Sequence, residues 1–391
     1  MRIRYSPTLG KVIDLLSSTS VQTSTRPKHL PALDGVRLLA VGLVILHHIT
    51  SGTHSSVFLH LIGLQRGNGL GPPLFFVLSG ALLTTVIIDA RDTENRYRNF
   101  LLRRVLRIFP LYFGYLAAAI IATWVVKGAP PRNFWVFAFF LQNIFPNVAA
   151  QTGSVMNTYH LWTIAVQDQF YVIWPLLLWR CKTDKQMRYL CYAGIVLTVL
   201  VRIAILHPAI TPELMGRSLP ARAGTMCLGA LIALERREKT FLTPLFLRSL
   251  LPLSIITAVW MWYGLDFFAP VGSVVGLELV GLLCAAFIAT AMQPASWITR
   301  VLGSKFFALG GKKYAFGMYM FHPFLLSLCT HLHLPKALQL STFLISTVVL
   351  AGVSYRYFEG PFLHIPVGRN PPKPVVPPRK TEAVGAPSFS S

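Results

Sequence analysis

The sequence predicts an all-α protein, a polytopic integral membrane helical bundle of about ten transmembrane helices plus one short re-entrant or interfacial segment. Of its 391 residues, 53% are hydrophobic and only 13% are charged, and its mean hydropathy is +0.55. Many apolar runs reach the roughly 20 residues that a helix needs to cross about 30 Å of hydrocarbon. These runs are continuous, whereas barrel strands alternate over roughly 10 residues, so helices are favoured.

Eleven apolar segments follow one another along the chain. The fourth, NFWVFAFFLQNIFP, has about 14 residues and spans about 21 Å as a helix, which is too short to cross upright. We therefore predict ten spans and a re-entrant or interfacial fourth segment. The segments lie near 35–53, 70–90, 109–127, 133–146, 160–180, 189–206, 219–234, 247–264, 272–292, 314–333 and 338–358.

The distribution of basic residues predicts the orientation of these spans. With ten spans and a cytoplasmic N-terminus, 27 of the 36 Lys and Arg residues lie on the cytoplasmic side, as the positive-inside rule requires. We therefore expect an inner (plasma) membrane protein, bacterial in type, with both termini cytoplasmic. The net charge of +22 favours membrane lipids as partners, and no motif indicates nucleic acid. Seven basic residues fall outside or in outer helix halves: Arg66, Lys127, Arg132, Arg202, Arg217, Arg222 and Lys336.

The composition predicts three regions. Residues 1–29 form a cytoplasmic basic N-terminal tail, and residues 30–363 form the membrane domain. Residues 364–391 are rich in proline, which predicts a disordered cytoplasmic tail.

The first segment, DGVRLLAVGLVILHH, carries ionisable residues in an apolar run. Arg37 and His48 lie eleven positions apart, so they share one face of a helix, about 16 Å apart along its axis. Arg37 alone is explained by snorkelling to the headgroups, and a single histidine by a helix–helix hydrogen bond. Their shared face favours one hydrophilic stripe along a cavity, in which His48 acts as a general base. His47 lies about 80° away and is assigned to packing or a hydrogen bond.

The next two segments carry small residues and then arginines. In GPPLFFVLSG, Ser79 and Gly80 allow close helix approach, and Ser79 is also a candidate for the donor-binding set. In RNFLLRRVLRIFPLY, Arg104 and Arg107 share a helix face, Arg103 precedes them, and Pro110 predicts a break in the helix. Positive-inside anchoring explains such a run, but paired arginines also bind phosphate.

Polar residues recur in three later segments. HLWTIAVQDQFYVIWP places Gln167 and Asp168 in mid-segment, where a carboxylate needs a partner, and a structural polar cluster is the alternative to a functional one. FGMYMFHP places His322 in an aromatic run, and YFEGP places Glu359 at the end of the last helix, where it fits a cap or an ion pair.

Together these motifs resemble the acyltransferase-3 family of membrane acyltransferases, which includes bacterial polysaccharide O-acetyltransferases. The resemblance runs from about Leu33 to Pro361. It rests on LDGVRLLAVGLVILHH, FFVLSGALL, RRVLRIFPLY, HLWTIAVQDQFY, YMFHP and YFEGP.

The resemblance implies an O-acyltransferase that moves an acyl group, typically acetyl, from cytoplasmic acyl-CoA to a hydroxyl of a glycan or glycolipid. It assigns catalysis to His48 and Arg37, and the family's RxxR element maps onto Arg104 and Arg107, which with Arg103 and Ser79 form the predicted donor site. The sequence departs from the family at Gln167, where a glutamate is usual, and Asp168 is the candidate for an imperfect substitute. No permanently bound cofactor and no metal are expected.

Two other functions remain open from the sequence. Intramembrane Arg, His and Asp residues also mark the substrate routes of secondary transporters. The glutamine at position 167 also suits a catalytically impaired member of the family.

Overall fold

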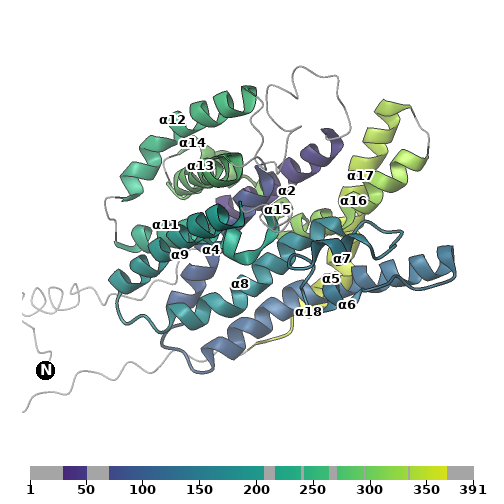
Figure 1. The fold of residues 1–391 in the computed structure, drawn as a ribbon, viewed down its shortest axis with the longest axis horizontal. Coiled ribbons are helices and arrows are strands. Elements are labelled where there is room, and N and C mark those ends of the chain that lie inside the picture. The colour runs from purple at the N-terminus through teal and green to yellow at the C-terminus, as the bar shows by residue number, and fades with distance from the viewer. Residues whose placement is uncertain are drawn as a thin grey trace, which may run out of the picture.

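The computed structural model describes residues 30–50, 70–206, 216–238, 242–263, 271–294, 296–332 and 335–367. The elements in these ranges are helices, and no strand occurs among them, which confirms the all-α prediction (Figure 1). The predicted N-terminal tail and nearly all of the predicted C-terminal tail lie outside the described residues. The limits of the three predicted regions stay predictions.

A helix occupies each of the ten segments that the hydropathy pattern predicted to span. They are α2 (Pro31–Thr50), α4 (Gly71–Asp89), α5 (Arg96–Lys127), α8 (Trp162–Leu178), α9 (Asp184–Ile205), α11 (Leu219–Glu238), α12 (Leu242–Trp262), α13 (Leu277–Ala291), α16 (Ala315–His331) and α17 (Lys336–Ser354). Shorter elements connect or extend them: α6 (Trp135–Ala138), α7 (Pro146–Ala150), η1 (Tyr159–Leu161), η2 (Gly272–Gly276), α14 (Trp297–Leu302), α15 (Lys305–Lys313), η3 (Tyr355–Glu359) and α18 (Gly360–Leu363).

Seven helical stretches in the described part of the chain are long and apolar enough to cross a membrane. This makes the chain an integral membrane protein, as predicted, although the number of ten spans is not established by length and composition. The other three helices do not meet this requirement of length and apolar composition. Helices α8 and α16 have 17 residues each, and α11 carries several charged side chains, including Arg222 and Glu235.

The short fourth segment does not form a spanning helix. It contains only the single-turn helices α6 and α7, which lie beside the second half of α5 (Figure 1). The backbone has a positive φ at Asn133 (53°) and at Phe140 (54°), a conformation that interrupts a helix. Buried polar side chains hold this segment, since Tyr112 donates a hydrogen bond to the Phe137 carbonyl at 2.8 Å.

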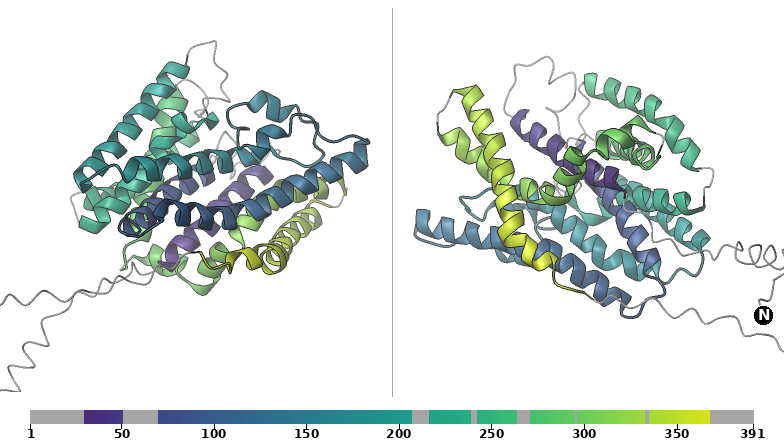
Figure 2. Two further views of the ribbon diagram at one scale, coloured as in Figure 1. Left: turned by 90° about the horizontal axis from the view of Figure 1, so that it is seen from below. Right: turned by 180° about the vertical axis from the view of Figure 1, so that it is seen from behind.

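The predicted break at Pro110 is wrong. Helix α5 runs through Pro110 without interruption from Arg96 to Lys127, so the arginines lie on the same helix as the apolar span. Proline is tolerated inside membrane helices where neighbouring groups compensate for the lost backbone hydrogen bond. At 32 residues, α5 is about 48 Å long, and the α6–α7 segment adjoins only one of its ends (Figure 2).

The centre of the bundle is built on close glycine contacts between α4 and α11. A Cβ atom on Gly80 would lie 1.8 Å from the carbonyl oxygen of Met226, and one on Gly229 would lie 1.9 Å from that of Val77. The two backbones are therefore in contact, as the small residues Ser79 and Gly80 predicted. This contact places Ser79, beside Gly80, in the middle of the molecule.

Candidate active site

A cavity of about 110 Å³ lies where α2, α4, α5, α8 and α16 meet. Four of the seven predicted site residues line it: Arg37, Ser79, Arg104 and Arg107. The remainder of its wall is mostly apolar or aromatic. Further lining residues are Phe75, Leu78, Leu82, Ile108, Thr163, Ile164, Gln167, Tyr171, Gly311, Ala315, Phe316 and Tyr319.

Arg37 reaches the cavity from the first turns of α2. It donates a hydrogen bond to the Asp34 carboxylate one turn earlier and forms an ion pair with it. Helix α15 approaches α2 at this point, because a Cβ atom on Gly311 would lie 1.7 Å from the Asp34 carbonyl oxygen. The close backbone contact fixes the position of the ion pair at the edge of the cavity.

Arg104 and Arg107 reach the cavity from α5. The Arg104 guanidinium lies 4.6 Å from the centre of the Tyr171 ring, and the Tyr171 hydroxyl donates a hydrogen bond to Ser79 Oγ at 3.3 Å. The charges of Arg37, Arg104 and Arg107 are close enough to interact. Among the described residues, the lining of the cavity contains these three arginines and no acidic residue, which suits a phosphate group.

A second, wider cavity of about 790 Å³ adjoins the first and shares Arg37, Leu82, Arg104 and Arg107 with it. We call it the basic mouth. It extends toward the connection between α4 and α5, where Arg96 and Arg103 line it. Arg103 thus lies in the mouth, one turn of α5 away from Arg107. Four of the five arginines of α5, Arg96, Arg103, Arg104 and Arg107, line one continuous route from the surface into the bundle.

His48 lies beyond the cavity, about three turns along α2 from Arg37, and contacts a second histidine. Its Nδ1 atom lies 3.1 Å from Nε2 of His322. The Nδ1 atom of His322 lies 2.8 Å from the Tyr319 carbonyl and 3.2 Å from the Met318 carbonyl. A carbonyl only accepts, so His322 Nδ1 carries the proton, and the Nε2 atom of neutral His322 accepts from His48 Nδ1. Neutral His48 then has its basic lone pair on Nε2.

A third histidine adjoins this pair. The His160 ring centre lies 5.5 Å from that of His322 and 5.9 Å from that of Tyr115 on α5. Both ring nitrogens of His160 are buried. The Tyr319 hydroxyl contacts Thr163 Oγ1 at 2.6 Å and donates to the His160 carbonyl at 2.5 Å. Thr163 and Tyr319 also line the 110 Å³ cavity, so they connect it to the histidines.

The structure does not bring Asp168 into the cavity. Gln167 lines it, whereas Asp168 lies one position round α8, with a buried Oδ2 that has no hydrogen-bond partner among the described residues. Arg104 is the charge that acts on it. Its predicted role stays a prediction. Glu359 is buried and accepts a hydrogen bond from Ser354 at 3.0 Å.

Three cavity residues with hydroxyl groups were not predicted: Thr163, Tyr171 and Tyr319. A signal for the first two was present, because Thr163, Gln167 and Tyr171 recur every four positions and so share one face of α8. No such spacing marks Tyr319, which lies one turn before His322 on α16.

The chain matches known proteins along most of its length. A family model described as an acyltransferase domain, that of the acyltransferase-3 family, matches residues 30–356. The peptidoglycan O-acetyltransferase OatA of Listeria monocytogenes is 26% identical over 363 residues, which is 85% of this chain and 56% of that protein. A Bacillus subtilis protein named "Putative peptidoglycan O-acetyltransferase YrhL" is 26% identical over 365 residues, covering 85% of this chain and 55% of the relative. The chain thus spans about half the length of these relatives. No solved structure matches.

Proposed function

The chain belongs to the acyltransferase-3 family, and from this premise we propose that it is an O-acetyltransferase that transfers an acetyl group from acetyl-CoA to a hydroxyl group of peptidoglycan or a related glycan. The acceptor class is suggested by the names of its relatives, which are peptidoglycan O-acetyltransferases. The observation that carries the proposal is the convergence of Arg37, Arg104 and Arg107 on one cavity that continues into the basic mouth.

The basic mouth and the cavity suit the CoA part of the donor. Its phosphates would be held by Arg104 and Arg107, with Arg96 and Arg103 nearer the surface, since guanidinium groups bind phosphate oxygens in pairs. By the positive-inside rule this mouth faces the cytoplasm. The long pantetheine arm would then run past Arg37 toward His48, about 16 Å further along α2. This arrangement favours donor orientation, rather than charge stabilisation at the thioester, as the role of Arg37.

His48 and His322 suit general base catalysis. The hydroxyl of the acceptor would lose its proton to His48 Nε2 while its oxygen attacks the thioester carbonyl. The new C–O bond forms, the C–S bond breaks, and the CoA thiolate takes the proton back from His48. His322 would act as a positioning residue, because it accepts from His48 Nδ1 and so keeps Nε2 as the basic atom.

The test is transfer by the purified protein in lipid nanodiscs, supplied with isotopically labelled acetyl-CoA and peptidoglycan fragments. We expect a mass shift of one acetyl group on a sugar of the fragment. His48→Ala should reduce this transfer by at least about 100-fold while acetyl-CoA still binds. A well-folded His48→Ala protein with native activity would refute the assignment. Counterflow of the glycan without acetyl-CoA would instead support a transporter.

A further inference from the structure

A third cavity, of about 270 Å³, lies near the end of α5 opposite to the basic mouth. We call it the distal pocket. Three contacts tie its wall to the second half of α5. Tyr115 donates to the Asn157 carbonyl at 2.7 Å, Thr123 Oγ1 accepts from the Val155 amide at 3.1 Å, and Lys127 Nζ donates to the Gly153 carbonyl at 2.8 Å. The chemistry described above does not use this pocket.

Four of the seven basic residues that depart from the positive-inside pattern, Lys127, Arg132, Arg217 and Arg222, lie at this pocket or next to residues that line it. Arg217 lines it, and the Lys127 ammonium lies at its rim. The Arg132 amide donates to the carbonyl of Thr152, another lining residue, at 2.9 Å. Arg222 lies 5.7 Å from the ring centre of Trp162, which also lines the pocket. These residues are far apart in the sequence, and only the fold collects them.

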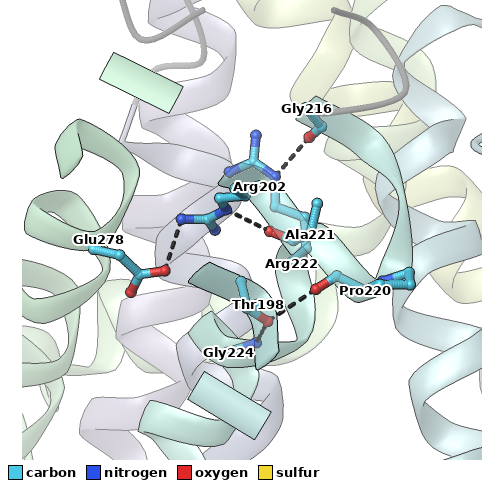
Figure 3. A network of polar contacts seen from close by, with 8 residues as sticks. All are labelled: Thr198, Arg202, Gly216, Pro220, Ala221, Arg222, Gly224 and Glu278. Carbon is cyan, nitrogen blue, oxygen red and sulfur yellow. Dashed lines mark hydrogen bonds and ion pairs between the residues drawn. The ribbon is translucent and has the colours of Figure 1, made fainter. Parts of the chain in front are cut away.

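Arg222 lies beside a second buried arginine, Arg202, and hydrogen bonds hold both side chains (Figure 3). Arg202 donates to Glu278 Oε1 at 2.7 Å and to the Ala221 carbonyl at 2.8 Å, and Arg222 donates to the Gly216 carbonyl at 2.6 Å. Glu278 pairs with Arg202, whereas the bond of Arg222 to the Gly216 carbonyl is to a neutral group, so the two arginines and the one carboxylate keep a net positive charge. One Nη2 atom on each arginine is buried without a partner among the described residues.

The lining of the distal pocket is itself suited to an anionic sugar. None of its lining residues is acidic, and Arg217 forms no ion pair with a described residue. The Arg217 guanidinium lies over the Tyr159 ring, 4.0 Å from its centre, and Tyr159 is 55% exposed. Gln142 donates through Nε2 to the Tyr112 hydroxyl and the Leu161 carbonyl, while its buried Oε1 has no partner among the described residues.

We propose that the distal pocket binds the acceptor through a sugar unit that carries a negatively charged group, a carboxylate or a phosphate. Arg217 pairs with that group, since its planar fork matches both anions. A sugar hydroxyl donates to Gln142 Oε1, and the exposed Tyr159 ring packs against the sugar. This inference rests on the proposed function for the identity of the ligand as acceptor. It adds the charge that the acceptor must carry and the residues that recognise it.

The pocket also lies on the correct side of the histidines for this role. Thr158, Tyr159 and Trp162 line the pocket, and His160 lies between them in sequence and packs on His322. The acceptor thus approaches the histidines from the distal pocket, while the donor approaches from the basic mouth.

The experiment measures equilibrium binding of three sugars to the full-length protein in nanodiscs by calorimetry. The probes are N-acetylglucosamine, which is neutral, N-acetylmuramic acid, which adds a carboxylate, and N-acetylglucosamine 1-phosphate. We expect the best anionic sugar to bind at least about tenfold more tightly than the neutral one, the effect of one charge-assisted contact. Preference for the phosphate over the carboxylate would indicate a lipid-linked sugar as the source of the charge. Equal affinities of the native protein for all three sugars would by themselves overturn the proposal.

Substitutions test whether Arg217 is the source of the preference for the anionic sugar. Arg217→Gln should abolish the preference for the anionic sugar and leave neutral sugar binding unchanged, and Arg217→Lys should retain part of it. Lys336→Gln is the matched control, because Lys336 is exposed, is a predicted outer basic residue and lies outside the pocket. A folded Arg217→Gln protein that keeps the full preference would refute the assignment. Acetyl transfer is assayed in parallel, so that anionic sugar binding without transfer would count against the proposed function alone, and transfer without sugar selectivity against this inference alone.

Discussion

The two ends of α5 both collect arginines, but in different ways. At the basic mouth, Arg96, Arg103, Arg104 and Arg107 are neighbours in sequence and lie on one helix. At the distal pocket, Arg217 comes from the residues just before α11, Arg222 from the start of α11 and Arg202 from α9. Arg202 and Arg222 are fully buried, and Arg202 pairs with Glu278. The first arrangement can be recognised in the sequence as a cluster of arginines. The second exists only after the chain has folded, which is why the sequence showed it merely as exceptions to a charge rule.

The comparison predicts that the two ends control different substrates. We expect Arg104→Gln combined with Arg107→Gln to raise the KM for acetyl-CoA by about 100-fold or more, because two charge-assisted phosphate contacts are lost. The KM for the glycan should stay unchanged, as measured by steady-state acetyl transfer. Arg300→Gln on α14, an exposed arginine outside the cavities, is the charge-matched control. A parallel rise in both KM values would show that the two ends do not act separately.

A smaller effect is expected at the histidines between the two ends. His322→Leu should lower kcat by about 10- to 100-fold, because His48 loses the acceptor that orients it. His322→Gln should retain more activity, since its amide oxygen can still accept from His48 Nδ1. The KM for acetyl-CoA should not change in either variant. Equal losses in both variants, or a change confined to KM, would contradict a positioning role.

The smallest effect, on stability rather than on activity, is expected at the contact between α4 and α11. Gly80→Ala forces a methyl group against the Met226 carbonyl, and such overpacking costs about 1 to 3 kcal/mol of unfolding free energy. Thermal unfolding in detergent should show a lower Tm. Gly42→Ala provides the control, because a Cβ atom there meets nothing within 4 Å. An unchanged Tm for Gly80→Ala would mean that α4 and α11 can move apart without a loss of unfolding free energy.

Local patterns in the sequence predicted the helices and much of the cavity. Continuous apolar runs gave the positions of ten helices, and helical spacing placed Arg104 and Arg107 on one face. The break at Pro110 was mispredicted because a local rule for proline ignores the neighbouring helices that compensate in a membrane. The contact between His48 and His322 joins residues 274 positions apart. No spacing rule reaches across that distance, so the position of His322 required the fold.

The ring layer between the basic mouth and the distal pocket has a consequence for the cell as well as for catalysis. Two hollows reach into the bundle from opposite ends of α5, and Tyr115, His160, Tyr319 and His322 lie between them in close contact. On the proposed mechanism, the donor and the acceptor reach this layer from opposite ends of α5. The same packed rings would then also keep the two hollows from joining into one open channel across the membrane.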